Sequence, residues 1–279
     1  MAVTPKVGAK LESDEPNLKL AVLIDADNAQ ATIIEGLLAE IATFGEATVK
    51  RIYGDFTSPA SAQWKKVLQT HAIKPIQQFA YTTGKNATDS TLIIDAMDLL
   101  YTRRFDGFCL VSSDSDFTGL ALRIREEGLI VLGFGEQKTP EAFRNACHKF
   151  IFTEVLRPVS PPKSSASPTQ APTTQTSQPF LATSGEPESP QKSLPSAVPR
   201  KFILGALGST QGDDAGWVNL GAFGNYLTKI KPDFDSRLYG FKKLSDLVKA
   251  MDDDLEIEAR KTAGSSAKAL YVRRRTAAS

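Results

Sequence analysis

Between residues 20 and 154, short apolar stretches alternate with helical ones, and this alternation restricts the possible folds more than any other feature. Strand patterns occur at 20–27, 48–56, 74–81, 107–114 and 129–136, with helical patterns between them at 31–44, 61–71, 88–104 and 117–128. The segments PEAFRNAC and KFIFTE add a short helix and a last strand. This βαβ rhythm predicts an α/β fold with a parallel sheet covered by helices on both faces.

Acidic residues gather where two of these strands are predicted to end. They are Asp25 and Asp27, with Asn28, after the first strand; Asp114 and Asp116, behind Ser112 and Ser113, after the fourth; and Asp89 at the start of the helix 88–104. Ligands of parallel sheets bind beyond the carboxyl ends of the strands, so these side chains are expected to share one rim. Carboxylates that converge repel one another unless a divalent cation lies among them, and oxygen-only ligands suit Mg²⁺ or Mn²⁺ rather than zinc. The rim therefore predicts metal-assisted attack of water on a phosphodiester.

Helix capping is the alternative role for each of these residues, because an Asp or Asn that follows a strand commonly caps the next helix. Asp27 or Asn28 is placed to cap the first helix, and Asp116 the helix at 117–128. Thr88 or Asp89 is placed to cap the long helix. Four acids from three separate segments at one rim favour a shared site over independent caps.

The long helix holds two further acids, Asp95 and Asp98. Asp95 lies six residues after Asp89, about a third of a turn away around the helix. This position is compatible with either a supporting carboxylate or a solvated helix face. Asp98 is expected to be exposed.

Other phosphate-handling folds fit the sequence less well. No strand is followed by GxxxxGK[ST] or by GxGxxG, which argues against a P-loop and against a dinucleotide-binding fold. The strand that ends in Asp-Ala-Asp is similar to the D-x-D-x-[TV] motif of haloacid-dehalogenase-type phosphatases. Its fifth position is Ala29, however, and no later lysine motif stands out, so the phosphatase is a poor match.

The chain resembles the NYN domain, in its LabA-like bacterial branch, in the segments LIDADN, GKNATDSTLIIDAMDLL and LVSSDSDFTGLALRIREEG. The resemblance covers roughly residues 18–155 and implies a PIN-like nuclease fold with metal-dependent ribonuclease activity. It implies catalytic roles for Asp25, Asn28, Asp89, Asp114 and Asp116, with the four acids as metal ligands. Secondary roles are expected for Asp27, Asp95, Ser112, Ser113 and Lys85, the last of which stands one residue further from Asp89 than in the commoner K-G-x-D form.

The composition changes sharply at residues 157–199, which hold ten of the 16 prolines and almost no large apolar residues. Such a segment cannot bury enough surface to offset its ordering entropy, so we expect a disordered, extended linker. Phe180 and Leu181 interrupt it, either as a short docking motif or by chance. The predicted organisation is a disordered stretch at 1–17, a first domain at 18–156, the linker, and a second domain at 200–276.

The second domain has the pattern of a winged helix. The order is a helical pattern at 200–209, a short extended entry followed by a helix within 217–234, and a third helical pattern at 236–251. Two alternating stretches that flank a Gly-Ser turn follow within 255–275. The segments YGFKKLSDLVKAM and YVRRR resemble the LOTUS domain, also called OST-HTH. That resemblance implies RNA binding and, in some members, a protein partner.

Charge divides unevenly between the two domains. Residues 1–157 carry 17 basic and 20 acidic side chains, a net charge of −3, whereas residues 200–279 carry 14 basic and 10 acidic ones, a net charge of +4. Phosphate contacts are therefore expected from the second domain. The candidates are Arg237, Lys242, Lys243, Arg260, Lys261, Arg273, Arg274 and Arg275, although surface Lys and Arg often serve only solvation.

Two functions fit these patterns. The first is an Mg²⁺- or Mn²⁺-dependent endoribonuclease that acts on single-stranded RNA, because a PIN-like nuclease needs a flexible strand in its cleft. The second is a non-catalytic RNA-binding or regulatory scaffold with the same fold. The intact set of acids favours the enzyme, since a binding domain has no need of carboxylates that repel one another.

The remaining features concern the compartment. The 2 cysteines, Cys109 and Cys147, show no disulfide or zinc spacing, which favours a reducing compartment. The apolar runs are too short to span a bilayer, and residues 1–17 lack the apolar core of a secretory signal. The sequence therefore predicts a cytoplasmic protein without membrane association.

Overall fold

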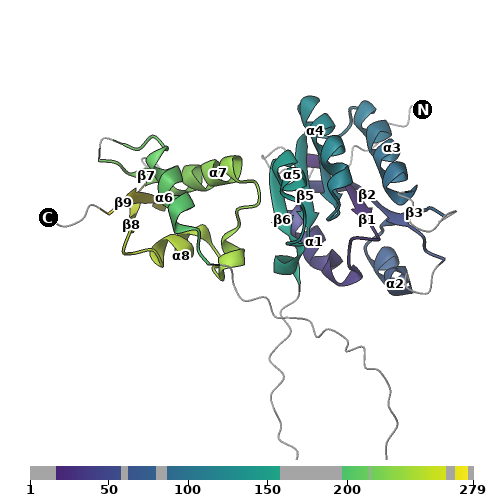
Figure 1. The fold of residues 1–279 in the computed structure, drawn as a ribbon, viewed down its shortest axis with the longest axis horizontal. Helices are drawn as coiled ribbons and strands as arrows, with labels where there is room; N and C mark the ends of the chain where they lie inside the picture. Colours follow the sequence, from purple (N-terminus) through teal and green to yellow (C-terminus); the bar gives the residue numbers. More distant parts are fainter. Residues whose placement is uncertain are drawn as a thin grey trace, which may run out of the picture.

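The computed structural model describes residues 17–57, 62–79, 87–157, 197–213, 215–261 and 268–275, which form two domains (Figure 1). Several features of the sequence lie outside the described residues. These are residues 1–16, Lys85, most of the predicted linker with Phe180 and Leu181, and the predicted turn of the wing. None of the described helices combines the length and apolar character needed to cross a membrane.

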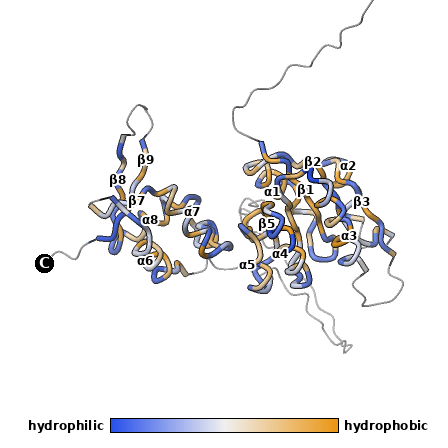
Figure 2. Tube along the Cα trace, turned by 90° about the horizontal axis from the view of Figure 1, so that it is seen from above, coloured by the Kyte–Doolittle hydropathy of each residue, from blue (hydrophilic) through white to orange (hydrophobic). Residues whose placement is uncertain are grey.

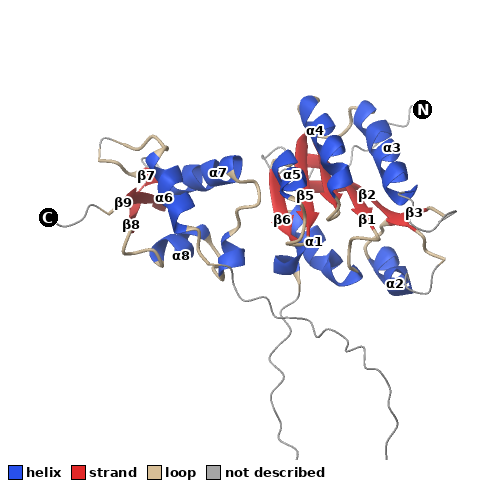
Figure 3. Ribbon diagram, in the orientation of Figure 1, coloured by secondary structure: helices blue, strands red, loops and turns tan. Residues whose placement is uncertain are grey.

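The first domain is built on a six-stranded sheet in the order β3-β2-β1-β4-β5-β6, and every neighbouring pair is parallel (Figure 3). The strands are β1 (Leu18–Asp25), β2 (Gly45–Gly54), β3 (Lys74–Gln77), β4 (Gly107–Val111), β5 (Ile130–Gly135) and β6 (Lys149–Phe152). The chain runs outward from β1 to β3 and then returns to place β4 on the other side of β1. The predicted parallel sheet is confirmed, and its topological switch point lies between β1 and β4.

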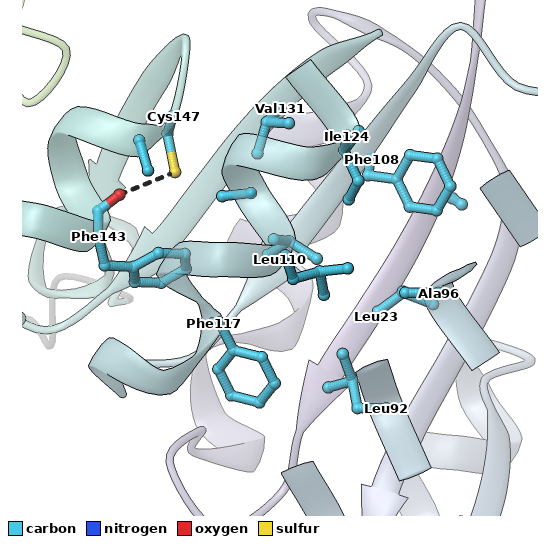
Figure 4. Close-up of a cluster of buried hydrophobic side chains, with 14 of the residues drawn as sticks. Leu23, Leu92, Ala96, Phe108, Leu110, Phe117, Ile124, Val131, Phe143 and Cys147 are labelled. Atoms are coloured by element: carbon cyan, nitrogen blue, oxygen red, sulfur yellow. Dashed lines mark hydrogen bonds between the residues drawn. The ribbon is translucent and has the colours of Figure 1, made fainter. Parts of the chain in front are cut away.

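Helices cover both faces of the sheet, as predicted. On one face lie α3 (Ala87–Tyr101), α4 (Thr118–Glu126) and α5 (Glu141–Ala146), and on the other lie α1 (Ile34–Ile41), α2 (Ala62–Thr70) and the short helices η1 (Ala31–Ile33) and η4 (Thr153–Leu156). Alternate residues of β1 serve the two cores: Leu23 packs with α3 and α4, and Val22 packs with α1. Figure 4 shows the first core, where aromatic and aliphatic side chains close the space between sheet and helices. In Figure 2 the hydrophobic residues concentrate on the central strands.

The second domain contains α6 (Arg200–Gly208), β7 (Val218–Asn219), α7 (Leu220–Ile230), η5 (Ser236–Tyr239), α8 (Leu244–Lys249), β8 (Leu255–Lys261) and β9 (Lys268–Arg274). Its antiparallel sheet has the order β7-β9-β8. The predicted single helix over 236–251 is wrong. Gly240 takes a left-handed conformation, with φ at 86°, and ends η5, so that α8 starts anew at Leu244.

The two domains touch each other, which the sequence analysis did not anticipate. Pro232, between α7 and η5, accepts a hydrogen bond of 2.9 Å from the backbone N–H of Phe150 in the edge strand β6. Arg144 of α5 forms an ion pair with Asp233, which is only 6% exposed. Leu238 of η5 packs against the core of the first domain. The second domain therefore covers part of the otherwise free edge of the sheet.

Candidate metal centre

The ends of β1 and β4 bring the first acidic segment beside the second. Ile24 of β1 pairs with Val111 of β4, so Asp25 and Ser112, one residue further along each strand, stand side by side at the switch point. Asp25 is 0% exposed and Ser112 is 2% exposed. A buried carboxylate needs hydrogen-bond donors, and the local chain supplies them.

Three donors hold the Asp25 carboxylate. Its Oδ2 accepts from the hydroxyl of Ser112 at 2.8 Å and from the side-chain amide of Asn28 at 2.7 Å, and its Oδ1 accepts from the backbone N–H of Asp27 at 2.9 Å. Burial raises the pKa of Asp25, and these hydrogen bonds act in the opposite direction. Asp25 is thus fixed in orientation at the floor of the site.

Three other carboxylates lie above this floor. Asp89 of α3 and Asp114 and Asp116 after β4 each offer an oxygen atom within 4.8 Å of the others. Burial, together with repulsion from Asp25 and Asp114, raises the pKa of Asp89 to about 6. A divalent cation would relieve this repulsion, and the oxygen-only donor set fits Mg²⁺ or Mn²⁺.

The predicted helix caps are distributed differently in the structure. Asp114, not Asp116, caps η3 (Ser115–Phe117), because its Oδ1 accepts from the backbone N–H of Asp116 at 2.9 Å. The backbone N–H of Asp114 in turn donates to the hydroxyl oxygen of Ser112 at 3.1 Å. The prediction that Asp116 caps the following helix is therefore wrong. Asp114 holds the turn and also belongs to the carboxylate cluster.

The first helix is not capped by either predicted residue. Gln30 precedes η1 and makes no side-chain capping bond, while Asn28 donates its amide to Asp25 instead. Asp27 is exposed at the rim. Thr88 and Asp89 lie inside the first turn of α3, which begins at Ala87.

Two charged residues near the rim, Glu136 and Lys138, were not predicted from the sequence. Glu136 follows β5, so it ends at the same rim as Asp25, and its backbone N–H donates to the hydroxyl of Ser113 at 2.9 Å. Lys138 forms an ion pair of 2.8 Å with the Glu136 carboxylate. The signal that could have found Glu136 is the one used for the other acids, namely its place directly after a strand.

Asp95 is hydrogen-bonded to two side chains of strand β2. Its carboxylate accepts hydrogen bonds from the guanidinium of Arg51 and from the hydroxyl of Tyr53, both on β2. It is not among the three clustered carboxylates, and its pairing with β2 excludes the solvated helix face that was one of the two roles considered for it. Asp98 is exposed, as predicted.

Most of the arginines proposed for phosphate binding already pair with acids of the second domain. Arg260 pairs with Asp213 at 2.6 Å and stacks on Trp217 and Tyr271, and Arg273 pairs with Glu256 at 2.8 Å. Arg275 lies 3.9 Å from Glu256, and Arg237 binds both Asp235 and Glu40. Three further candidates are exposed, namely Lys242, Lys243 and Arg274. The side chain of Lys261 lies outside the described residues.

Two family models match parts of the chain. The family model of the NYN domain matches residues 19–156, and that of the OST-HTH/LOTUS domain matches residues 192–266. None of the curated proteins matches the chain.

Two similar solved structures have no assigned function. An uncharacterized protein of Nitrosomonas europaea is 51% identical, over 37% of this chain and 96% of its own, with a TM-score of 0.28. A protein of unknown function from Vibrio parahaemolyticus is 22% identical, over 51% of this chain and 96% of its own, with a TM-score of 0.42. Through its two family matches, residues 19–156 of the chain belong to the NYN domain family and residues 192–266 to the OST-HTH/LOTUS domain family.

Proposed function

We propose that this protein is a metal-dependent endoribonuclease that cleaves single-stranded RNA and holds it with its OST-HTH/LOTUS domain. NYN domains are typically nucleases and LOTUS domains bind RNA, which supports the pairing of these activities in one chain. The observation that carries the proposal is the convergence of Asp89, Asp114 and Asp116 at the switch point, above the buried Asp25.

Each residue of the cluster has a distinct part in this proposal. Asp89, Asp114 and Asp116 would hold Mg²⁺ or Mn²⁺ through carboxylate oxygens. When bound, such an ion supplies a more acidic water and neutralises charge on the phosphoryl oxygens. Asp25 contributes negative charge from below, and Ser112 and Asn28 keep its carboxylate from turning away. Phosphodiester hydrolysis is the reaction that this donor set suits.

Incubation of the full chain with end-labelled single-stranded RNA tests the proposal. We expect internal cleavage with Mg²⁺ or Mn²⁺, no cleavage with EDTA, and recovery when the metal is restored. A duplex RNA of the same sequence serves as the control and should be cut more slowly. RNA binding without any metal-dependent cleavage would contradict the enzyme and leave the RNA-binding scaffold.

A further inference from the structure

A groove of about 380 Å³ runs between the two domains. Lys149, the first residue of β6, lines it from the NYN side, and Lys242 and Lys243, just before α8, line it from the OST-HTH/LOTUS side. Asn225 and Thr228 of α7 add polar side chains. The groove is therefore composite: its basic residues come from both domains.

The charges in this interdomain groove do not cancel. Its two acids, Glu40 and Asp235, both bind Arg237: Glu40 with two hydrogen bonds of 2.7 and 3.0 Å, and Asp235 at 2.6 Å. The ammonium group of Lys149 lies 4.8 Å from the centre of the Phe44 ring, a contact that leaves its charge in place.

The three lysines of the groove, Lys149, Lys242 and Lys243, form no ion pair with any other residue that the structure describes. Three lysines without an ion pair among the described residues thus line a concave surface whose acids are already neutralised in part. That surface suits a polyanion, in which several negative charges follow one another along a chain.

The contacts that dock the domains also form the groove. Arg237 of η5 reaches across to Glu40 of α1, and the ion pair of Arg144 with Asp233 lies on the same junction. Without this docking, Lys149 would be separated from Lys242 and Lys243. Arg237 therefore acts on the groove as a positioning residue rather than as a phosphate ligand.

The groove is distinct from the carboxylate cluster. Lys149 of β6 is level with Val22 of β1, because Lys149 pairs with Leu132, Leu132 with Cys109, and Cys109 with Val22. Strand β6 lies three strands from β1, and Val22 lies three residues before Asp25. Strand spacing and rise place the backbone of Lys149 roughly 18 Å from that of Asp25. An anchor at this distance is within reach of a single strand a few nucleotides long.

We propose that the interdomain groove binds backbone phosphates of the single-stranded RNA, so that full RNA affinity requires the two domains to be docked. The identity of the ligand rests on the proposed function, while the anion site itself rests on the lysines. Because the basic residues come from both sides of the domain junction, RNA affinity should depend on Arg237 and Glu40, which hold the two sides together.

Equilibrium binding of a fluorescent single-stranded RNA to the full chain in EDTA tests this proposal without relying on cleavage. The variants are Lys149→Gln, Glu40→Arg, Arg237→Glu and the charge-swapped double variant Glu40→Arg/Arg237→Glu. Lys74→Gln is the matched control, because Lys74 is the first residue of β3, the opposite edge strand. Thermal melting checks that each variant is folded.

We expect Lys149→Gln to weaken binding several-fold and to reduce the slope of log affinity against log salt by about 0.7, the value for one lost phosphate contact with a single strand. Glu40→Arg should also weaken binding, although it makes the protein more positive. The double variant should regain part of the affinity, because Asp235 still repels the carboxylate placed at position 237. If Lys149→Gln matches Lys74→Gln, or if Glu40→Arg binds RNA as tightly as the unmodified protein or more tightly, the groove is not an RNA site. Absence of cleavage in the earlier assay would leave this measurement unaffected.

Discussion

The hydroxyl of Ser112, at the end of β4, donates a hydrogen bond of 2.8 Å to Oδ2 of Asp25, at the end of β1. The same hydroxyl oxygen accepts from the backbone N–H of Asp114 at 3.1 Å. One serine thus ties the buried carboxylate of the first acidic segment to the turn that carries the second. The geometry of the whole cluster depends on this link between neighbouring strands.

Replacing Ser112 with alanine should destabilise the protein as well as slow cleavage. Asp25 is fully buried, so removal of one donor leaves part of its hydrogen-bonding capacity unsatisfied, at a cost of about 1–3 kcal/mol. Urea unfolding in EDTA measures the free energy of unfolding. Ser115→Ala, on the exposed side of the same turn, is the control and should change stability little. Equal stability of both variants would show that the Ser112 bond contributes nothing.

Two substitutions of Asp114 separate its charge from its capping role. Asp114→Asn keeps a capping oxygen for the Asp116 N–H and removes a charge from the cluster, so the metal-free protein should be at least as stable as the unmodified one. Asp114→Ala removes the same charge and also the cap, so it should be about 0.5–2 kcal/mol less stable than Asp114→Asn. Both should lose cleavage activity. An Asp114→Asn protein that melts well below the unmodified protein without metal would contradict the assignment of repulsion in the cluster.

The metal-free protein should lose stability as the pH rises from about 4 to about 6. The pKa of Asp89 is raised to about 6 in the folded chain, so the folded state holds a proton that the unfolded state has released by about pH 4. The stabilising contribution is present at low pH and is lost as Asp89 ionises beside the other carboxylates. Thermal melts in EDTA at pH values from about 4 to 7 measure the effect, and Asp89→Asn should flatten it. If Asp89→Asn has the same dependence of stability on pH as the unmodified protein, ionisation of Asp89 does not cause the loss of stability.

Asp95 should matter for stability and not for catalysis. Its carboxylate accepts from Arg51 and Tyr53, and the Arg51 and Asp95 side chains are 23% and 21% exposed. Removing one partner of a fully buried pair costs roughly 3–5 kcal/mol, so Asp95→Ala should cost less, about 2 kcal/mol. Its rate of RNA cleavage under conditions where it is folded should stay near that of the unmodified protein. A large loss of cleavage in a stably folded Asp95→Ala protein would place Asp95 in the site.

The fold was predictable where the hydrophobic pattern was long and regular. Alternating strand and helix patterns gave the parallel sheet and both helical layers, since the period of apolar residues directly reflects burial. The pattern failed over 236–251, which was expected to form one helix and which Gly240 divides into η5 and α8. The short extended entry expected at the start of 217–234 is strand β7, Val218–Asn219.

The site was predictable from strand ends but not in its details. A carboxylate directly after a parallel strand must lie at the rim, which identified Asp25 and Asp114. Whether Asp114 or Asp116 caps the next turn depends on backbone angles at a helix boundary, which sequence patterns place only within one or two residues. The pairing of Arg237 with Glu40 joins residues 197 positions apart, and no local pattern could indicate it.

The most direct test compares two substitutions on one helix. Asp89 and Asp98 both lie on α3, the first in the carboxylate cluster and the second exposed to solvent. The initial rate of cleavage of labelled single-stranded RNA in Mg²⁺ or Mn²⁺ is measured for Asp89→Asn, Asp98→Asn and the unmodified protein. The proposed metal-dependent ribonuclease predicts that Asp98→Asn cleaves like the unmodified protein while Asp89→Asn is inactive. Cleavage by Asp89→Asn at the unmodified rate, or cleavage by any of the three in EDTA, would contradict it.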